Sequence, residues 1–167
     1  MKIGLISDTH GVLDHDFCGF LEPVDEIWHA GDWGGDAAFL QRFRDLGKPI
    51  VGVYGNCDGY PVRYDYPEFQ CFVREGLKVL MTHIGGYPGH YNPVARRVIM
   101  EEKPGLFVCG HSHILKVQWD EKYRMMTMNP GAAGLQGWQV FRTALRFNVS
   151  AGEVSGLEVF KLPRNQA

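Results

Sequence analysis

Seven side chains that can bind a metal ion follow short apolar runs of the sequence. They are two carboxylates, one amide and four imidazoles, namely Asp8, His10, Asp32, Asn56, His83, His111 and His113. Oxygen and imidazole ligands suit manganese, iron, nickel and zinc better than calcium, which prefers all-oxygen sites. Seven ligands are too many for one tetrahedral ion but enough for two ions that share a carboxylate. Two ions about 3.5–4 Å apart form a site typical of phosphoryl chemistry.

Each of these motifs alone is weakly specific. Asp8-x-His10 and Gly31-Asp32 occur in many loops that do no chemistry. The pair His111 and His113 is more specific, because side chains at i and i+2 leave an ordinary strand on opposite faces. Only a tight turn after the strand can direct both imidazoles to one site. The prediction of a metal site therefore depends on all five motifs occurring together, each in a loop after an apolar run.

Alternating strands and helices in the first third of the chain must position the first three of these motifs. The sequence predicts strands over 2–7, 26–30 and 50–54, with helices over 14–21 and from residue 36 to about 46. This order favours parallel strands with helices packed outside. In such a sheet, ligands bind beyond the carboxyl ends of the strands, which is where the first three motifs fall.

The rest of the chain is predicted to be richer in strands. A helix is expected over about 93–103, and strands over 69–74, 77–82, 106–109, 114–119, 124–128, 143–149 and 156–162. This pattern indicates a mixed sheet, or two sheets packed face to face. We find no internal repeat or linker, so the sequence predicts one domain over residues 1–167.

The composition excludes several functional classes. With 17 Lys and Arg against 19 Asp and Glu, the formal net charge of −2 offers no basic surplus for duplex nucleic acid or an anionic membrane. No apolar run approaches the roughly 18 residues of a membrane span, and the first residues do not resemble a signal peptide. We therefore expect a cytoplasmic protein with reduced thiols. None of the four cysteines forms a Cys-x-x-Cys pair, so a structural zinc knuckle is not expected.

The combined motifs resemble those of the calcineurin-like metallophosphoesterases. The resemblance covers residues 1 to about 134. It is carried by Asp8-x-His10, Gly31-Asp32, Gly55-Asn56-x-Asp58, His83, Gly110-His111-x-His113 and Asn129-Pro130-Gly131. The chain is similar to the compact bacterial and archaeal phosphodiesterase branch, which shares its fold with a retromer subunit. The resemblance implies an α/β protein, a four-layer α/β/β/α sandwich of two mixed β-sheets flanked by helices.

The resemblance also implies two divalent metal ions and assigns their ligands. The first ion takes Asp8, His10, Asp32 and His113, and the second takes Asp32, Asn56, His83 and His111, with Asp32 as the bridge. Manganese is the favoured metal, and nickel, iron, zinc and magnesium are alternatives. The implied reaction is in-line attack on phosphorus by a hydroxide that bridges the ions, with Asp32, Asn56, Cys57 and His83 as the catalytic residues.

Cys57 is a departure from the family pattern. Many members have histidine after the Gly-Asn pair, where it protonates the leaving group or holds the phosphate. A thiol can donate a proton or a hydrogen bond, but it cannot place a positive charge beside phosphate. We therefore expect weak protonation of the leaving group and a preference for esters with acidic leaving groups.

Asn56, Cys57, His90 and Tyr60 are the candidate substrate contacts. Related chains often read His-Gly-His at the position of His83-Ile84-Gly85. His90 either returns an imidazole to the site from the following loop or is an exposed loop histidine. Tyr60 either stacks on an aryl group or nucleobase or packs on its own domain.

Several other side chains are expected to have structural roles. Asp58 is expected to orient a neighbouring group or cap the turn, and His29 to be packed or at the surface. Arg142 is expected at the surface, whereas Cys18, Cys71 and Cys109 are expected in the core.

The sequence therefore predicts a metal-dependent phosphodiesterase that acts on a small organic or nucleotide phosphodiester. A phosphomonoesterase is one alternative. A metal-lined scaffold that binds partner proteins is another, although such a scaffold would be expected to have lost metal ligands. The sequence leaves the substrate, the metal and the formation of a homo-oligomer open.

Overall fold

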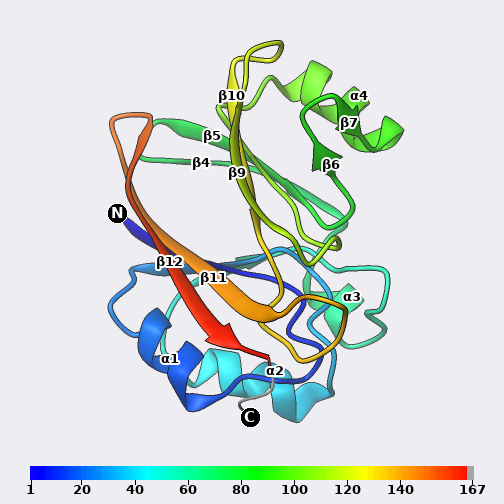
Figure 1. The fold of residues 1–167 in the computed structure, drawn as a ribbon, viewed down its shortest axis with the longest axis vertical. Helices are drawn as coiled ribbons and strands as arrows, with labels where there is room; N and C mark the ends of the chain where they lie inside the picture. Colours follow the sequence, from blue (N-terminus) through cyan, green and yellow to red (C-terminus); the bar gives the residue numbers. More distant parts are fainter. Residues whose placement is uncertain (165–167) are drawn as a thin grey trace.

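Two five-stranded mixed sheets form the centre of the computed structural model, which describes residues 1–164 (Figure 1). The first sheet contains, in spatial order, β12 (Glu153–Pro163), β11 (Phe141–Ser150), β1 (Lys2–Ile6), β2 (Glu26–His29) and β3 (Ile50–Gly52). The second contains β4 (Phe69–Arg74), β5 (Leu77–Thr82), β8 (Leu106–Val108), β10 (Met125–Pro130) and β9 (Leu115–Asp120). The two sheets face each other as the inner layers of the fold.

Helices form the outer layers. Helices α1 (His15–Leu21) and α2 (Ala37–Arg44) cover the outer face of the first sheet, and α4 (Pro93–Glu102) covers that of the second (Figure 1). The helices begin where the sequence predicts, because Asp14, Asp36 and Asn92 accept hydrogen bonds from backbone N–H groups of the first turns. The predicted four-layer α/β/β/α sandwich is confirmed.

Each sheet contains three parallel strands. Strands β1, β2 and β3 run parallel to one another at one side of the first sheet, and β5, β8 and β10 do so in the middle of the second. Antiparallel strands complete the sheets, with β11 and β12 on the other side of the first and β4 and β9 at the two sides of the second. The carboxyl ends of the parallel strands therefore meet at one edge of each sheet, where they can deliver side chains to a common site.

The largest apolar cluster fills the space between the two sheets. Ile3 and Trp28 of the first sheet belong to it together with Val79 and Val108 of the second. Each fully buried side chain of this size contributes about 1.5–3 kcal/mol through the hydrophobic effect. This core holds the two strand-end edges in register, which a site built from both sheets requires.

Two short elements were not predicted from the sequence. Helix α3 (Val62–Asp65) follows the third motif, and the hairpin of β6 (Gly86–Tyr87) and β7 (His90–Tyr91) follows the fourth. Both are too short for a periodic apolar pattern. The hairpin extends the wall beside the strand ends of the second sheet (Figure 1).

The expectation of a surface position for Arg142 is wrong. Its side chain is fully buried: Nε donates to the carbonyl of Ala133 over 2.7 Å, and the guanidinium lies 4.8 Å from the ring centroid of Phe17. An ion pair of 2.5 Å with Asp14 partly neutralises its charge. A buried arginine needs such partners, and two of them, Asp14 and Phe17, come from a distant part of the chain.

Cys71 was expected in the core but is exposed. Along β4 the neighbouring Phe72 faces the core, so Cys71 points to the other face, where its thiol lies 3.4 Å from Glu102 of α4. Cys109 is buried as expected, and Cys18 is partly buried.

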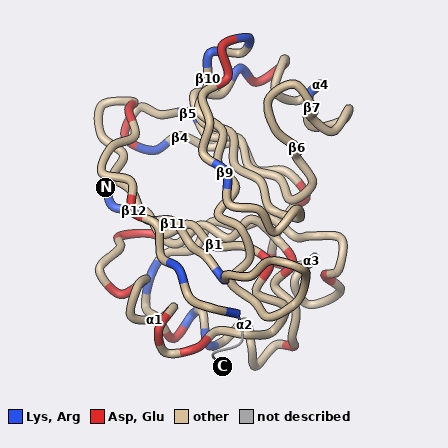
Figure 2. The backbone as a smooth tube through the Cα atoms, viewed as in Figure 1, with Lys and Arg blue, Asp and Glu red and all other residues tan. Residues whose placement is uncertain are grey.

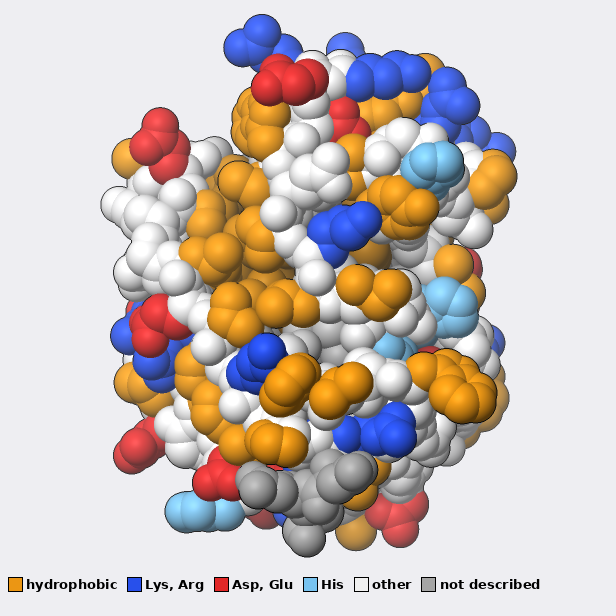
Figure 3. All heavy atoms as spheres, in the orientation of Figure 1, with side chains coloured by type: hydrophobic (Ala, Val, Ile, Leu, Met, Phe, Trp, Pro, Cys, Tyr) orange, Lys and Arg blue, Asp and Glu red, His pale blue; other side chains and the backbone are white. Residues whose placement is uncertain are grey.

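Positions of basic and acidic residues are interspersed along the backbone (Figure 2). On the face drawn in Figure 3, hydrophobic side chains separate many of the charged ones. Among residues 1–164, no helix is long and apolar enough to span a membrane.

Candidate metal centre

The structure brings the five sequence motifs to the adjoining strand-end edges of the two sheets. Asp8 and His10 follow β1, Asp32 follows β2, Asn56 follows β3, His83 follows β5, and His111 and His113 follow β8. Backbone hydrogen bonds tie the loops together. The N–H of Asp8 donates to the carbonyl of Gly31 over 2.9 Å, and the N–H of Gly110 donates to that of His83 over 3.0 Å. The site therefore rests on rigid elements of both sheets.

Five of the candidate ligands have a left-handed backbone. Their φ angles are 53° for Asp8, 46° for His10, 52° for Asp32, 68° for His111 and 59° for His113. This conformation is uncommon outside glycine and costs about 1–3 kcal/mol at each residue. It turns the side chains out of the alternation of a strand. His111 and His113 can therefore both point to one site.

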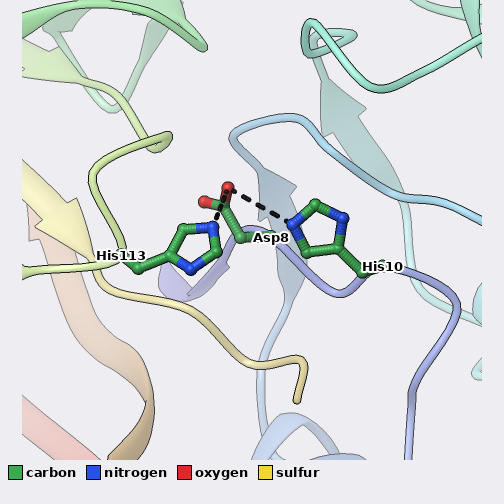
Figure 4. A group of neighbouring side chains, drawn as sticks. All are labelled: Asp8, His10 and His113. Carbon is green, nitrogen blue, oxygen red and sulfur yellow. Dashed lines mark ion pairs between the residues drawn. The ribbon is translucent and has the colours of Figure 1, made fainter. Parts of the chain in front are cut away.

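The carboxylate of Asp8 is buried, and its two oxygens have different neighbours. Its Oδ2 accepts hydrogen bonds from the Ser7 hydroxyl over 2.6 Å and from the backbone N–H of His111 over 3.1 Å. Its Oδ1 lies 3.0 Å from Nε2 of His113 and 4.0 Å from Nε2 of His10 (Figure 4). One oxygen thus fixes the carboxylate, while the other faces two imidazoles.

The two oxygens of Asp32 also have different neighbours. Its Oδ1 accepts a hydrogen bond from the backbone N–H of Cys57 over 2.8 Å. Its Oδ2 lies 3.2 Å from Nε2 of His83 and 3.9 Å from Nε2 of His10. This carboxylate is therefore near imidazoles from both sheets.

Backbone carbonyls orient two of the imidazoles. Nδ1 of His83 lies 2.7 Å from the carbonyl of Ala30, and Nδ1 of His113 lies 3.1 Å from that of Gln136 and 3.2 Å from Oε1 of Gln139. A carbonyl accepts from the protonated nitrogen, so Nε2 keeps a free lone pair directed at the carboxylates. Metal-binding histidines are commonly held in this way.

The donor atoms at the centre fit a divalent cation. Within the described residues, Asp8 Oδ1, His10 Nε2 and His83 Nε2 are buried and have no hydrogen-bond partner. Such unsatisfied buried atoms are rare and costly. Asp8, His10 and His113 form one group of donors within 4.8 Å of one another, and Asp32, His83 and His111 form a second. Two cations could satisfy both groups.

Asn56 and Cys57 lie at the exposed rim of this cluster. The Asn56 amide donates to Cys57 Sγ over 3.4 Å, and Cys57 belongs to a third donor group with His10 and Asp32. Partial burial and the charge of Asp32 raise the pKa of the Cys57 thiol to about 11. In the absence of a cation this side chain is thus a neutral hydrogen-bond donor.

Asp58 and His29 support the site without belonging to a donor group among the described residues. The carboxylate of Asp58 accepts backbone N–H groups of Trp33, Gly34 and Gly55 over 2.8–3.2 Å, and so orders the loops after β2 and β3. The ring of His29 is buried and stacks on Trp33 at 3.7 Å. Both observations agree with the structural roles expected from the sequence.

The structure also reveals supporting residues that sequence reasoning missed. They are Ser7, which donates to Asp8, and Gln136 and Gln139, which contact His113. Ser7 is next to a ligand in the sequence and could have been noticed. The loop of Gln136 and Gln139 follows β10 and carries no motif, so only the fold places it beside His113.

The two other candidate substrate contacts have different surroundings. His90 lines a cavity of about 340 Å³ that His111 also lines, although His90 is not in a donor group of the described chain. Tyr60 is 82% exposed and is not in the wall of this cavity. It is also not in the wall of a second cavity, which is lined in part by Asn56 and His83. Its neighbour Tyr66 packs on Trp33 instead, with ring centroids 4.5 Å apart.

The carboxylates and imidazoles of the centre shift one another's pKa values. Burial alone would raise the pKa of Asp32, but the imidazole of His83 at 3.2 Å and the N–H of Cys57 hold it below its ordinary value. Burial alone would lower the pKa of His83, yet the nearby carboxylates of Asp32 and Asp8 raise it. The carboxylate of Asp8 at 3.0 Å raises the pKa of His113. Burial and the charge of His83 lower the pKa of His111.

These shifts predict a pH dependence of metal binding. Protons compete with cations at His83 and His113, so metal affinity should rise between about pH 6 and about pH 8 with release of protons. Without metal, the raised pKa values contribute stability below the ordinary histidine pKa of about 6.5, and this is lost as the pH rises through the folded values. Calorimetric manganese titrations and thermal unfolding at both pH values measure the two trends. Equal metal affinity at both would contradict the assignment of these ligands.

Comparison with known proteins identifies the family. The sequence profile of the calcineurin-like phosphoesterase superfamily domain matches residues 1–152. The chain belongs to this superfamily. A comparison with curated protein sequences gives no significant match. The predicted resemblance is therefore confirmed, and the family places the chain among metal-dependent phosphoester hydrolases.

Solved structures share the fold at low sequence identity. An archaeal phosphodiesterase has a TM-score of 0.75 at 23% identity, over 97% of this chain and 100% of that one. Vps29 of Entamoeba histolytica complexed with zinc has a TM-score of 0.74 at 14% identity, over 99% and 100%. A predicted phosphoesterase of Streptococcus pneumoniae has a TM-score of 0.65 at 22% identity, over 98% and 90%. At these identities the likeness shows the fold alone.

Proposed function

We propose that this chain is a phosphodiesterase with two divalent metal ions, acting on a small organic or nucleotide phosphodiester. The observation that carries the proposal is the pair of donor groups that meet between Asp8 and Asp32, with buried atoms left unsatisfied. One ion would be held by Asp8, His10, Asp32 and His113, and the other by Asp32, Asn56, His83 and His111. Manganese is the favoured metal.

The bound ions would polarise the phosphate oxygens and allow water to attack phosphorus near neutral pH. The chain's own residues prepare this chemistry. Ser7 and the N–H of Cys57 each occupy one carboxylate oxygen, and leave the other oxygen of Asp8 and of Asp32 for a cation. Because the ligand positions are set before a substrate arrives, little reorganisation is needed during the reaction.

Asn56 and Cys57 are proposed to meet the substrate at the exposed rim. The Asn56 amide can donate to a phosphate oxygen, and the Cys57 thiol can donate to the leaving group. Cys57 supplies no positive charge, so rates should fall as the leaving group becomes more basic. A series of aryl phosphodiesters gives this dependence directly.

Two adjoining cavities favour a diester over a monoester. One is lined in part by His111, and the other, of about 270 Å³, by Asn56 and His83; both have Ile84 and Asn92 in their walls. A phosphodiester carries two organic groups on phosphorus, and each cavity can accept one of them. A monoester would fill only one.

The decisive experiment compares a diester and a monoester. We expect manganese-loaded protein to hydrolyse bis(para-nitrophenyl) phosphate faster than para-nitrophenyl phosphate. Asn56→Ala and His111→Ala should each lower the diester rate by about 100-fold. Tyr64→Ala, at a side chain that is 83% exposed, is the matched control and should retain the wild-type rate.

Two outcomes would overturn this assignment. A much faster monoester reaction would make the chain a phosphomonoesterase. Equal inertness of the wild type and both variants after loading with manganese, nickel and zinc would favour a metal-binding scaffold. That alternative has structural support, because Vps29 proteins are among the structures that share the fold.

A further inference from the structure

The walls of the larger cavity beside the metal centre come mainly from residues between positions 84 and 92 and between positions 110 and 116. The hairpin β6–β7 supplies Tyr87 and His90, the start of β9 and the residue before it supply Lys116 and Ile114, and Ile84 lies between β5 and β6. His111 of the second donor group is also in the wall. The cavity of about 340 Å³ therefore adjoins the second donor group, where the phosphate is proposed to bind.

Apolar and aromatic groups dominate this wall. The side chains of Ile84, Tyr87 and Ile114 are partly exposed, at 39%, 43% and 61%. Binding is favourable when a ligand removes such apolar side chains from water. On the face drawn in Figure 3, hydrophobic side chains lie beside histidine and basic side chains over β6, β7 and β9. The surface thus combines an apolar floor with positive charge.

The aromatic groups are arranged beside a lysine. The rings of Tyr87 and His90 have centroids 5.0 Å apart, and the ammonium of Lys116 lies 3.8 Å from the centroid of Tyr87. Among the described residues that line the cavity, none is acidic. Lys116 also has no ion-pair partner within the described part of the chain. A flat ligand attached to an anionic group suits this combination.

The neighbouring cavity has a different character. Its wall contains both Arg63 and Glu68, and the guanidinium of Arg63 lies 4.4 Å from the ring centroid of Tyr54. A wall with charges of both signs suits a polar group better than an apolar ring. The two cavities therefore distinguish the two organic groups of a diester.

We propose that the cavity between the β6–β7 hairpin and β9 is the specificity site for a planar aromatic group, an aryl ring or a nucleobase, attached to the scissile phosphate. This inference rests on the proposed function for the position of the phosphate. Tyr87 and Ile114 contact the aromatic group, and Lys116 faces the negative charge next to it. His90 acts here as part of the wall rather than as a metal ligand.

A pair of non-hydrolysable probes tests the site apart from catalysis. Phenylphosphonate and methylphosphonate carry the same anionic group and differ in the organic group on phosphorus, which is aromatic only in the first. Calorimetry with manganese-loaded protein should show phenylphosphonate binding about five- to tenfold more tightly, as expected for one aromatic contact. Tyr87→Ala should remove this preference while the affinity for methylphosphonate stays within about twofold.

A second variant and a control guard against misfolding. Ile114→Trp fills the cavity without removing apolar surface and should also abolish the preference for phenylphosphonate. Tyr64→Ala removes an exposed tyrosine outside the cavity and should keep it. A preference that survives both cavity variants, or that is absent in the wild type, would overturn the proposal.

The two proposals fail in different ways. Protein that binds phenylphosphonate with a Tyr87-dependent preference but hydrolyses no ester would refute the phosphodiesterase and leave the aromatic site supported. Hydrolysis of diesters without any preference for phenylphosphonate would support the phosphodiesterase and refute the aromatic site. Wild-type protein that neither binds phenylphosphonate in preference nor hydrolyses any ester would overturn both.

Discussion

Asp32→Asn is expected to lower diester hydrolysis by more than about 100-fold and to remove at least one metal ion from the protein. The substitution keeps the size of the side chain but replaces a carboxylate that lies 3.2 Å from His83 and 3.9 Å from His10. Changes to groups that merely support metal ligands already cost about 10- to 100-fold. Because Asp32 is proposed to bind both ions, its loss should cost more. Metal content after dialysis and the rate with bis(para-nitrophenyl) phosphate measure the two effects.

The matched control for this variant is Asp65→Asn. Asp65 forms an ion pair of 2.6 Å with Arg44 at the surface of α3, so its loss should change stability by about 1 kcal/mol or less and leave the metal content unchanged. An Asp32→Asn protein with two bound ions and more than a tenth of the wild-type rate would contradict the bridging position.

Gly55→Ala is expected to disable the site without removing any ligand. A methyl group at position 55 would overlap both Oδ1 and the backbone nitrogen of Asp32. The backbone contact cannot be relieved by rotating a side chain, so Asp32 itself must move. Overpacking of this kind costs about 1–3 kcal/mol of folding free energy. We expect metal affinity and diester hydrolysis to fall by about 100-fold as Asp32 leaves its position.

Gly59→Ala provides the control in the same loop. Among the described residues, no heavy atom lies within 4 Å of a Cβ at this position, and the glycine is exposed. This variant should therefore match the wild type in metal content, rate and thermal unfolding. If Gly55→Ala also binds two ions with unchanged affinity, the close packing of the loops around Asp32 is not what positions the ligand.

Most of the framework could be predicted from local sequence patterns. Strands such as β4 and β5 and the helix α4 fall within a residue or two of the expected ranges, because apolar periodicity and capping residues are local signals. The candidate metal-ligand motifs were recognisable for a related reason. Each comes directly after an apolar strand, and parallel strands deliver their carboxyl ends to one edge.

The failures concern features that a local apolar pattern does not encode. Arg142 was expected at the surface, yet it is buried against Ala133, Asp14 and Phe17, which lie in other segments. The β6–β7 hairpin is two residues per strand and has no period to detect. Hence the sequence could suggest His90 as a substrate contact but could not show the cavity that it shares with His111.

By itself the sequence determined which donor atoms are present, their order, and that strands would bring them to one region. Only the tertiary structure decided how they are directed. The left-handed backbone at Asp8, Asp32 and His111 is an uncommon conformation that the surrounding loops must hold. The carbonyls of Ala30 and Gln136 select which imidazole nitrogen faces the centre. These contacts join residues far apart in the chain, so they exist only after the two sheets have packed together.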